Sequence, residues 1–386
     1  MDLMRMLLEA GVNVDLPNAS LKTPLHAVLS KKDEECASLL ISYGCSVNTQ
    51  DKCNDSPLMT AVDLILENSV RLLLAKGADP NYTKVIKRWD ANSKTSILAA
   101  AVKRQNLKII RLLFEYGADT SCKDSLNDLI DIAMWNGNST LMKYLIDKGA
   151  KVNSKLNDTT LLSRALGYGS GNGRENIVQI LLDHGANVKL ADKNGKTALE
   201  RFRDSRNLID KTVLCLVRHL ALMRSGGQTI GKKNYSLLKN DAKFKKYYRM
   251  CINELSKMRM KKIFQSSLSL YDILTRTENE MIRCLQNKNI VETIRSSDLS
   301  TDYPLYSWNL RYKLAKAQER SNLMNKGRHF LNEVIDVEMP PEIITLICEY
   351  LKNEDLTNLG KISLHTSDNT KSFSMSLRTR KRRKYC

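Results

Sequence analysis

The sequence predicts an all-α solenoid followed by a smaller helical C-terminal domain. Two recurring phrases indicate the solenoid: a helix end closed by Gly, found six times, and a helix start that follows each glycine by about twelve residues. In the second half of the chain the phrases stop, but apolar residues keep helical spacing.

The first phrase reads as the end of an amphipathic helix followed by a turn. Its fullest copy is LLLAKGADPN, Leu72 to Asn81. We expect its glycine to take the left-handed conformation that a Cβ atom disfavours. The equivalent glycines are Gly11, Gly44, Gly77, Gly117, Gly149 and Gly185. Their intervals of 33, 33, 40, 32 and 36 residues are typical of a repeat protein.

The second phrase supplies the start of the next helix. Its clearest copy is TPLH, Thr23 to His26. Thr, Ser or Asp at this place can accept hydrogen bonds from free amides, and Pro24 and Pro57 suit the first helical position. Weaker copies are SPLMTA (56–61), TSILAA (95–100), DLIDIA (128–133), TLLSRA (160–165) and TALERF (197–202).

Together, the period, TPLH and GADPN resemble ankyrin repeats. The resemblance implies about six units, each a hairpin turn with two antiparallel helices, over residues 1–205. Such arrays present extended surfaces to protein partners. Leu3, Met6 and Leu7 would belong to a lone second helix, so we expect a first repeat that is truncated from a longer protein or capped unusually, with frayed or exposed apolar residues.

No pattern for catalysis, a cofactor or a metal stands out, so we predict a non-enzymatic protein. His26 is expected to bond within the turn before its helix, since no Ser or Cys nucleophile accompanies it. GGQTIGKK from Gly226 resembles a phosphate loop, but Lys233 replaces the Ser or Thr and a helix is expected before it.

Two insertions break the period. TKVIKRWDANSK (83–94) lengthens one turn and is expected to project Lys87, Arg88 and Trp89 as contacts for the target protein. Alternatively, Trp89 folds back over the neighbouring turn. The second, GYGSGNGREN (167–176), is rich in Gly and predicts a flexible connector.

Charge and cysteine content limit the setting. The net charge of +19 divides into +2 for Met1–Glu200 and +17 for the remainder. The basic half could meet nucleic acid or an acidic protein, or form a solvated exterior. Because few aromatic residues alternate with the charges, we do not expect nucleic acid as a partner. Nine cysteines without a CxxC pair favour reduced thiols, and no apolar run is long enough for a membrane span.

Residues 206–330 predict a helical linking region. FKKYYRMCINELSKMRMKKIF (244–264) places Tyr247, Cys251 and Leu255 near helical spacing, while its lysines stay in solvent. Such a stripe is usually core.

The segment 331–360 predicts a short helix with one apolar face. Pro340 and Pro341 suit a helix start, and Glu342 suits its positive end. The opening Met-Pro-Pro-Glu-Ile resembles an F-box, and ankyrin repeats with such a segment resemble the poxvirus ankyrin proteins, whose C-terminal region is called PRANC. This implies an adaptor that binds the linker subunit of a cullin ubiquitin ligase. The implied contacts are Met339, Pro340, Glu342, Ile343, Ile344, Ile347, Tyr350, Leu351 and Leu356.

The tail 361–386 is expected to be disordered and basic. The tail offers a nuclear-import candidate, a segment that attracts nucleic acid, or a merely solvated end. Its basic cluster is Arg378, Arg380, Lys381, Arg382, Arg383 and Lys384. We therefore expect a viral adaptor in the host cytoplasm or nucleus that carries a host protein to the ligase. The alternative is a scaffold that sequesters a host factor without a ligase.

Overall fold

The structure is a computed structural model. It describes residues 2–87, 92–119, 126–167, 174–205, 210–263, 267–285, 291–292, 294, 298–334, 341–351, 353 and 355–357. These residues form two compact units. Unit 1 comprises Met1–Leu220 and Thr229–Lys245, and unit 2 comprises Ala221–Gln228 and Lys246–Cys386.

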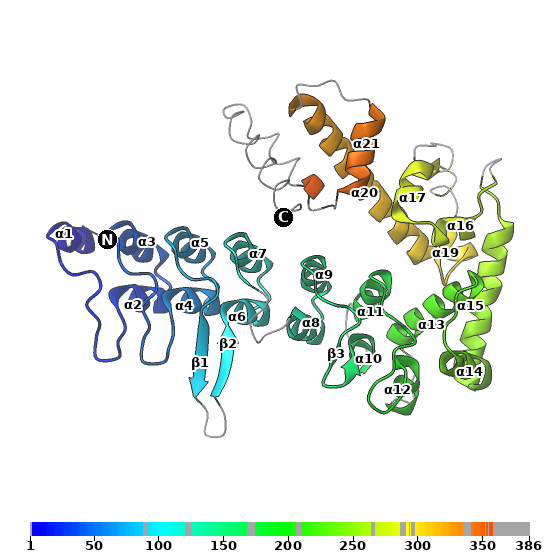
Figure 1. The fold of residues 1–386 in the computed structure, drawn as a ribbon, viewed down its shortest axis with the longest axis horizontal. Helices are drawn as coiled ribbons and strands as arrows, with labels where there is room; N and C mark the ends of the chain where they lie inside the picture. The colour runs from blue at the N-terminus through cyan, green and yellow to red at the C-terminus, as the bar shows by residue number, and fades with distance from the viewer. Residues whose placement is uncertain are drawn as a thin grey trace, which may run out of the picture. The chain divides into compact units, whose positions relative to one another are not determined.

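Unit 1 is built from two layers of short helices (Figure 1). One layer contains α2 (Pro24–Ser30), α4 (Pro57–Asp63), α6 (Ile97–Lys103), α8 (Leu126–Trp135) and α10 (Leu161–Gly167). The other contains α1 (Asp2–Glu9), α3 (Glu34–Ser42), α5 (Glu67–Ala75), α7 (Leu107–Glu115), α9 (Ser139–Asp147) and α11 (Arg174–Asp183). From α2 to α11 each helix packs on its partner, and most pack on the equivalent helix of the next pair. Between α7 and α9 the contact is made by the rings of Phe114 and Tyr144, whose centroids lie 5.8 Å apart. The predicted solenoid is confirmed.

The predicted glycine turns are confirmed. All six marking glycines have positive φ, from 78° at Gly185 to 104° at Gly149. Pro24 and Pro57 open α2 and α4, and Ser56 caps α4 by accepting from the Met59 amide at 3.1 Å. Asp128 differs from expectation, because α8 already begins at Leu126 and Asp128 therefore lies within its first turn.

An asparagine latch joins the turns of successive repeats. Asn48 Nδ2 donates to the Gly77 carbonyl at 2.9 Å, and its Oδ1 accepts from the Asp79 amide at 2.9 Å. Asn81 and Asn153 repeat this arrangement toward Gly117 and Gly185. Since a side-chain amide can donate and accept at once, one residue fixes both the carbonyl and the amide of the next turn.

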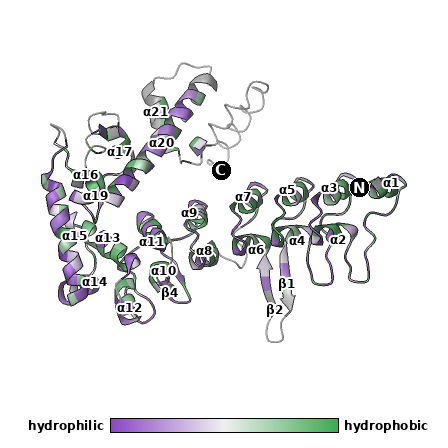
Figure 2. Ribbon diagram, turned by 180° about the vertical axis from the view of Figure 1, so that it is seen from behind, coloured by the Kyte–Doolittle hydropathy of each residue, from purple (hydrophilic) through white to green (hydrophobic). Residues whose placement is uncertain are grey.

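The helices of the first layer, α2, α4, α6, α8 and α10, are called the inner helices. They pack closely because small residues face the neighbouring helix. Ala61, Ala100, Ala133 and Ala165 are all buried, and Leu25, Leu58 and Leu98 fill the space between layers. Figure 2 shows apolar residues throughout the repeat helices, in contrast to the largely hydrophilic α15. The exposed apolar surface expected at the first helix is also confirmed, with Leu3 71% and Met6 65% exposed.

Unit 1 continues past the boundary expected at residue 205. After α12 (Ala198–Ser205) come α13 (Lys211–Ser225), whose last five residues lie in unit 2, and α14 (Lys232–Asn240). Asn234 on α14 is buried and donates to the carbonyls of Val188 and Ile230, while Thr197 donates to its Oδ1 at 2.8 Å. These bonds attach α14 to the last repeat. The segment before Gly226 is helix α13, as expected.

Unit 2 is a helical bundle around one apolar cluster. Its elements are α15 (Ala242–Met260), whose first four residues lie in unit 1, α16 (Leu270–Thr275), α17 (Glu278–Leu285), α19 (Leu299–Asp302), α20 (Ser307–Val334) and α21 (Pro341–Tyr350). Cys251, Leu255 and Met258 of α15 are buried in this cluster, so the predicted core stripe is confirmed. The helix α20 runs across the boundary expected at residue 330. None of the described helices is both long and apolar enough to cross a membrane.

The positive φ of Ile65 strains the backbone, and relieving this strain should stabilise the fold. The two helices of four repeats are joined through a left-handed residue, namely Lys32 (φ 59°), Ile65 (φ 62°), Gln105 (φ 57°) and Gly137 (φ 73°). A β-branched residue is the least suited to this conformation. We expect Ile65→Asn to raise the free energy of unfolding by about 0.5–1 kcal/mol, since Ile65 is 45% exposed and makes few contacts to lose.

The measurement is urea unfolding followed by far-ultraviolet circular dichroism. Gly137→Ala is the matched control, because it adds a Cβ atom at the equivalent turn, and it should lower stability by about 1 kcal/mol. A destabilised Ile65→Asn variant would contradict the strain at this turn.

Candidate interaction surfaces

The hairpin turns between successive helix pairs of unit 1 are called fingers below. The insertion after Gly77 forms an antiparallel hairpin that lengthens one of them, the long finger (Figure 1). Strand β1 (Thr83–Lys87) pairs with β2 (Asn92–Ser96), with Thr83 opposite Ser96 and Lys87 opposite Asn92. Lys87 ends the first strand. Arg88 and Trp89 lie outside the described residues, as does the side chain of Lys87, so their target contacts stay a prediction. A shorter hairpin, β3 (Lys155–Leu156) with β4 (Thr159–Thr160), lies in a later finger.

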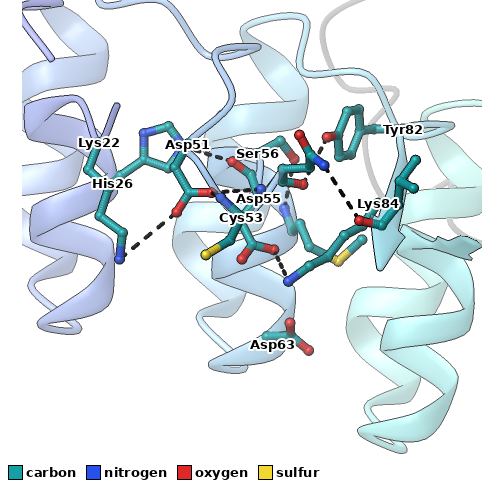
Figure 3. Close-up of polar contacts among 12 residues, drawn as sticks. Lys22, His26, Asp51, Cys53, Asp55, Ser56, Asp63, Tyr82 and Lys84 are labelled. Carbon is teal, nitrogen blue, oxygen red and sulfur yellow. Dashed lines mark hydrogen bonds and ion pairs between the residues drawn. The ribbon is translucent and has the colours of Figure 1, made fainter. Parts of the chain in front are cut away.

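Beside the long finger, a hollow of about 240 Å³ opens between the first two full repeats. Its lining is mostly polar: Lys22, His26, Ser30, Asp51, Asp55, Thr60, Asp63 and Leu64. Figure 3 shows five of these residues on the turns and helices of adjacent repeats: Lys22, His26, Asp51, Asp55 and Asp63. The hollow thus combines groups that are far apart in the sequence.

A tight turn places the first two carboxylates. Asp51 is buried, and its Oδ1 accepts from the amides of Cys53 at 2.8 Å and Asp55 at 2.9 Å. Asn54 closes the turn with φ of 54°, a conformation that Asn tolerates. Asp192 accepts from the amides of Asn194 and Lys196 in the same way, so the turn is a property of the repeat.

His26 joins two repeats at the floor of the hollow. Its Nδ1 lies 2.9 Å from Thr23 Oγ1 and 3.3 Å from the Thr23 amide, while its Nε2 lies 3.0 Å from the Asp55 carbonyl. Burial lowers the pKa of His26, and this effect exceeds the opposing influence of Asp55 and Asp51. The predicted structural role of His26 within its turn is confirmed.

Basic side chains from neighbouring repeats surround the carboxylates. Lys84 Nζ from the long finger lies 2.6 Å from Asp55 Oδ1, and Arg104 lies 3.2 Å from Asp63. Burial by itself would lower the pKa of Lys84, but its hydrogen bond to Asp55 and the charge of that group raise it. Lys22 is a weaker partner, 3.9 Å from Asp51.

The hollow is suited to recognition. Carboxylate and hydroxyl oxygens line it, and these groups accept hydrogen bonds from cationic or amide side chains of a partner. The described residues contain no group of three or more His, Cys, Asp or Glu arranged to hold a metal ion. Asp51, Asp55 and Asp63 carry no motif that marks them in the sequence, although the lengthened turn that brings Lys84 to Asp55 is visible there.

The second candidate surface is helix α21 in unit 2, which begins within the segment whose sequence resembles an F-box. The backbone of Glu342, Ile343 and Tyr350 lies in this helix, while Met339 and Pro340 lie outside the described residues. Ile344 is only 6% exposed, Leu356 is fully buried, and Leu351 packs against the core cluster; Ile347 is half-buried. In this structure Ile344 and Leu356 therefore face their own unit, so the surface available on α21 is narrower than the sequence suggested.

Arg320 of α20 holds the end of α21 in place. Its guanidinium donates to the carbonyls of Glu349 at 3.0 Å and Leu351 at 3.1 Å, and to the side chains of Asn353 and Asn279. Arg283 of α17 adds an ion pair to Glu349 at 3.4 Å. Because Gly327 lacks a side chain, Leu356 approaches α20 so closely that a Cβ atom there would lie 2.8 Å from its Cδ2.

The basic cluster from Arg378 to Lys384 lies outside the described residues, so its role in nuclear import stays a prediction.

Comparisons with known proteins match both parts of the chain. The family model for ankyrin repeats matches in three copies, at residues 1–84, 83–156 and 129–202. The model for the PRANC domain matches residues 265–361, which includes α21.

Two relatives come from fowlpox virus (strain NVSL). Putative ankyrin repeat protein FPV219 is 26% identical over 331 residues, covering 83% of this chain and 64% of its own length. Putative ankyrin repeat protein FPV222 is 24% identical over 365 residues, covering 92% of this chain and 47% of its own. The chain thus spans less than two thirds of either relative. Among solved structures, the human ASB11 ankyrin repeat domain is 23% identical with a TM-score of 0.43, covering 55% of this chain and 90% of that domain.

The lowered pKa of His26 gives the repeats a pH dependence. In the unfolded chain His26 has its ordinary pKa of 6.5, whereas in the folded chain its pKa is lower. His26 therefore does not reduce the free energy of unfolding above about pH 6.5. Its effect lowers that free energy as the pH drops through 6.5 toward the pKa of the folded chain. We expect His26→Gln to show a smaller loss in urea midpoint between about pH 7.5 and 5.5 than the unmodified chain. An unchanged pH dependence in His26→Gln would contradict this assignment.

The contacts of Arg320 predict how α21 is anchored. Arg320→Met should remove the hydrogen bonds that the buried guanidinium donates to the carbonyls of Glu349 and Leu351, which costs about 1–3 kcal/mol. Amides of α21 should then exchange hydrogen roughly 10- to 100-fold faster, as measured by mass spectrometry. Lys326→Met, at an exposed position of the same helix, serves as control. Equal exchange in both variants would show that Arg320 does not anchor the helix.

Proposed function

We propose that this chain, which belongs to the ankyrin-repeat family and carries a PRANC domain of the poxvirus type, is an adaptor between a host protein and a cullin ubiquitin ligase. The repeats bind the host protein, and the F-box-like segment of unit 2 binds the linker subunit of the ligase. One observation carries the proposal: the same chain contains ankyrin repeats with a long finger and a PRANC domain that includes α21. Both families are typically interaction modules, so the role needs no catalytic group.

The long finger and the adjoining hollow form the proposed binding surface for the target. The finger is tied to the array by the Lys84–Asp55 ion pair and by the Tyr82 hydroxyl, which donates to the Asn54 carbonyl at 2.9 Å. These contacts fix the base of the hairpin beside the carboxylates. A surface that is held in place before binding loses less entropy when the target binds. Lys87, Arg88 and Trp89 are proposed as further contacts.

The proposed ligase surface lies on α21 and the residues before it. Ile344, Cys348 and Leu356 are buried within unit 2, so they position the helix in this conformation. The linker subunit would then contact Met339, Pro340, Glu342, Ile343 or Tyr350, unless α21 is displaced from α20. Tethering both partners to one chain raises the effective concentration of the target near the ligase.

The burial of Ile344 and Leu356 also favours a second candidate function. If α21 serves only the core of unit 2, the chain is a scaffold that sequesters a host signalling or transcription factor through its repeats. We propose the host cytoplasm as the place of action in either case, with entry to the nucleus through the basic tail.

Affinity purification from host cells with mass spectrometry tests the proposal. In Glu342→Arg/Ile343→Glu, the cullin and its linker should be lost while the target is retained. In Thr60→Lys/Asp63→Lys, the target should be lost while the cullin is retained, because two cations replace hydrogen-bond acceptors of the hollow. The exposed Arg104–Asp63 pair contributes little stability, so this second variant should stay folded.

A target recovered without any cullin, from the intact chain and from both α21 substitutions, would support the sequestering scaffold and reject the ligase half.

A further inference from the structure

The helix α15 carries a cationic face that neither proposed surface uses. Lys246, Arg249 and Lys257 are exposed and lie three to eleven residues apart, and Lys261 follows one turn after Lys257. At about 100° per residue, these positions fall along one side of the helix. Figure 2 shows α15 as largely hydrophilic. All four belong to unit 2.

The opposite side of α15 is buried in the core of unit 2. Cys251, Leu255 and Met258 are buried there. Glu254 is the only acidic residue from 242 to 262, and it is turned inward, where it accepts from the amides of Leu305 at 3.0 Å and Tyr306 at 2.9 Å. The exposed side of the helix therefore has no carboxylate of its own.

Two other cations of this region have structural partners. Arg259 packs over the Tyr271 ring at 4.2 Å and donates to the Ser225 carbonyl at 2.8 Å. Lys262 donates to the Ser267 carbonyl at 2.9 Å. By contrast, the ion pairs of the described residues do not include Lys246, Arg249, Lys257 or Lys261. Holding four like charges along one helix side costs repulsion, which an anionic partner would relieve.

We propose that this face binds the phosphate backbone of double-stranded nucleic acid without reading its sequence. From Lys246 to Lys257 the helix rises about 16 Å, and Lys261 follows just past its end, so these cations can reach several phosphates of a duplex. The exposed Asn253 lies between them and can donate to a phosphate or sugar oxygen.

The expectation against nucleic acid was based on the scarcity of aromatic residues. Aromatic side chains are needed to bind single strands, whose bases stack on aromatic rings. A duplex keeps its bases stacked on one another, and backbone contacts require cations and hydrogen-bond donors only. Duplex binding is therefore the form of nucleic-acid recognition that this face fits.

The proposal is tested on the purified full chain by fluorescence anisotropy with a random-sequence duplex of about 20 base pairs, over a range of salt concentrations. Lys246→Gln/Arg249→Gln/Lys257→Gln/Lys261→Gln should weaken binding at least about tenfold at moderate salt. It should also flatten the dependence of log K on log salt by about 3 to 4, close to one for each lost phosphate contact.

The matched control is Lys31→Gln/Lys52→Gln/Lys76→Gln/Lys151→Gln, which removes the same charge from exposed positions of unit 1. It should leave duplex affinity within about twofold. Circular dichroism checks that both variants remain folded. Equal losses in the two variants would overturn the proposal, because total charge rather than the α15 face would then explain binding.

Two further probes separate the competing partners. A single strand of equal length should bind more weakly than the duplex. Polyglutamate and anionic phosphatidylserine vesicles should show no difference between the α15 variant and the control. A larger effect of the α15 variant on either of these probes than on the duplex would overturn nucleic-acid binding in favour of an acidic protein or a membrane surface.

Discussion

The array depends on the burial of apolar side chains between successive helix pairs. A single pair of seven- to ten-residue helices cannot cover both faces of Leu25, Leu58 or Leu98, so each repeat needs its neighbours. Small alanines allow the inner helices to approach, and glycine turns return the chain for the next pair. On α1, Leu3 and Met6 stay exposed, because none of the helices that the structure describes covers this apolar face.

The polar network of the fingers is a second layer of order above this core. Asparagine latches join neighbouring turns, and His26 connects Thr23 of one repeat with the Asp55 carbonyl of the next. Each bond adds little stability by itself, because water competes for the same groups. Their combined effect is to fix the direction of the fingers, and that direction decides which side chains meet in the hollow.

Unit 2 illustrates how one charged side chain can organise backbone. Arg320 satisfies two carbonyls at the end of α21, and Glu254 satisfies two amides at the start of α20. In both cases a buried charge compensates free groups at a helix end, where the backbone lacks partners of its own. As a result α21 is integrated into its unit, and the outer side of α15 carries cations but no carboxylate of its own.

The sequence by itself determined the repeat architecture, the glycine turns, the proline-started helices, the long finger and the helix at Pro341. These features depend on local rules: positive φ favours glycine, proline suits a helix start, and apolar residues recur at helical spacing. Only the tertiary structure decided that Asp51, Asp55 and Asp63 share a hollow, that Ile344 and Leu356 point inward, and that Glu254 leaves the cations of α15 unopposed. Such facts depend on contacts between residues about 30 to 50 positions apart, as with His26 and Asp55 or Glu254 and Leu305. Periodicity along the chain predicts which side of a helix is apolar, but it does not predict which other element that side will meet.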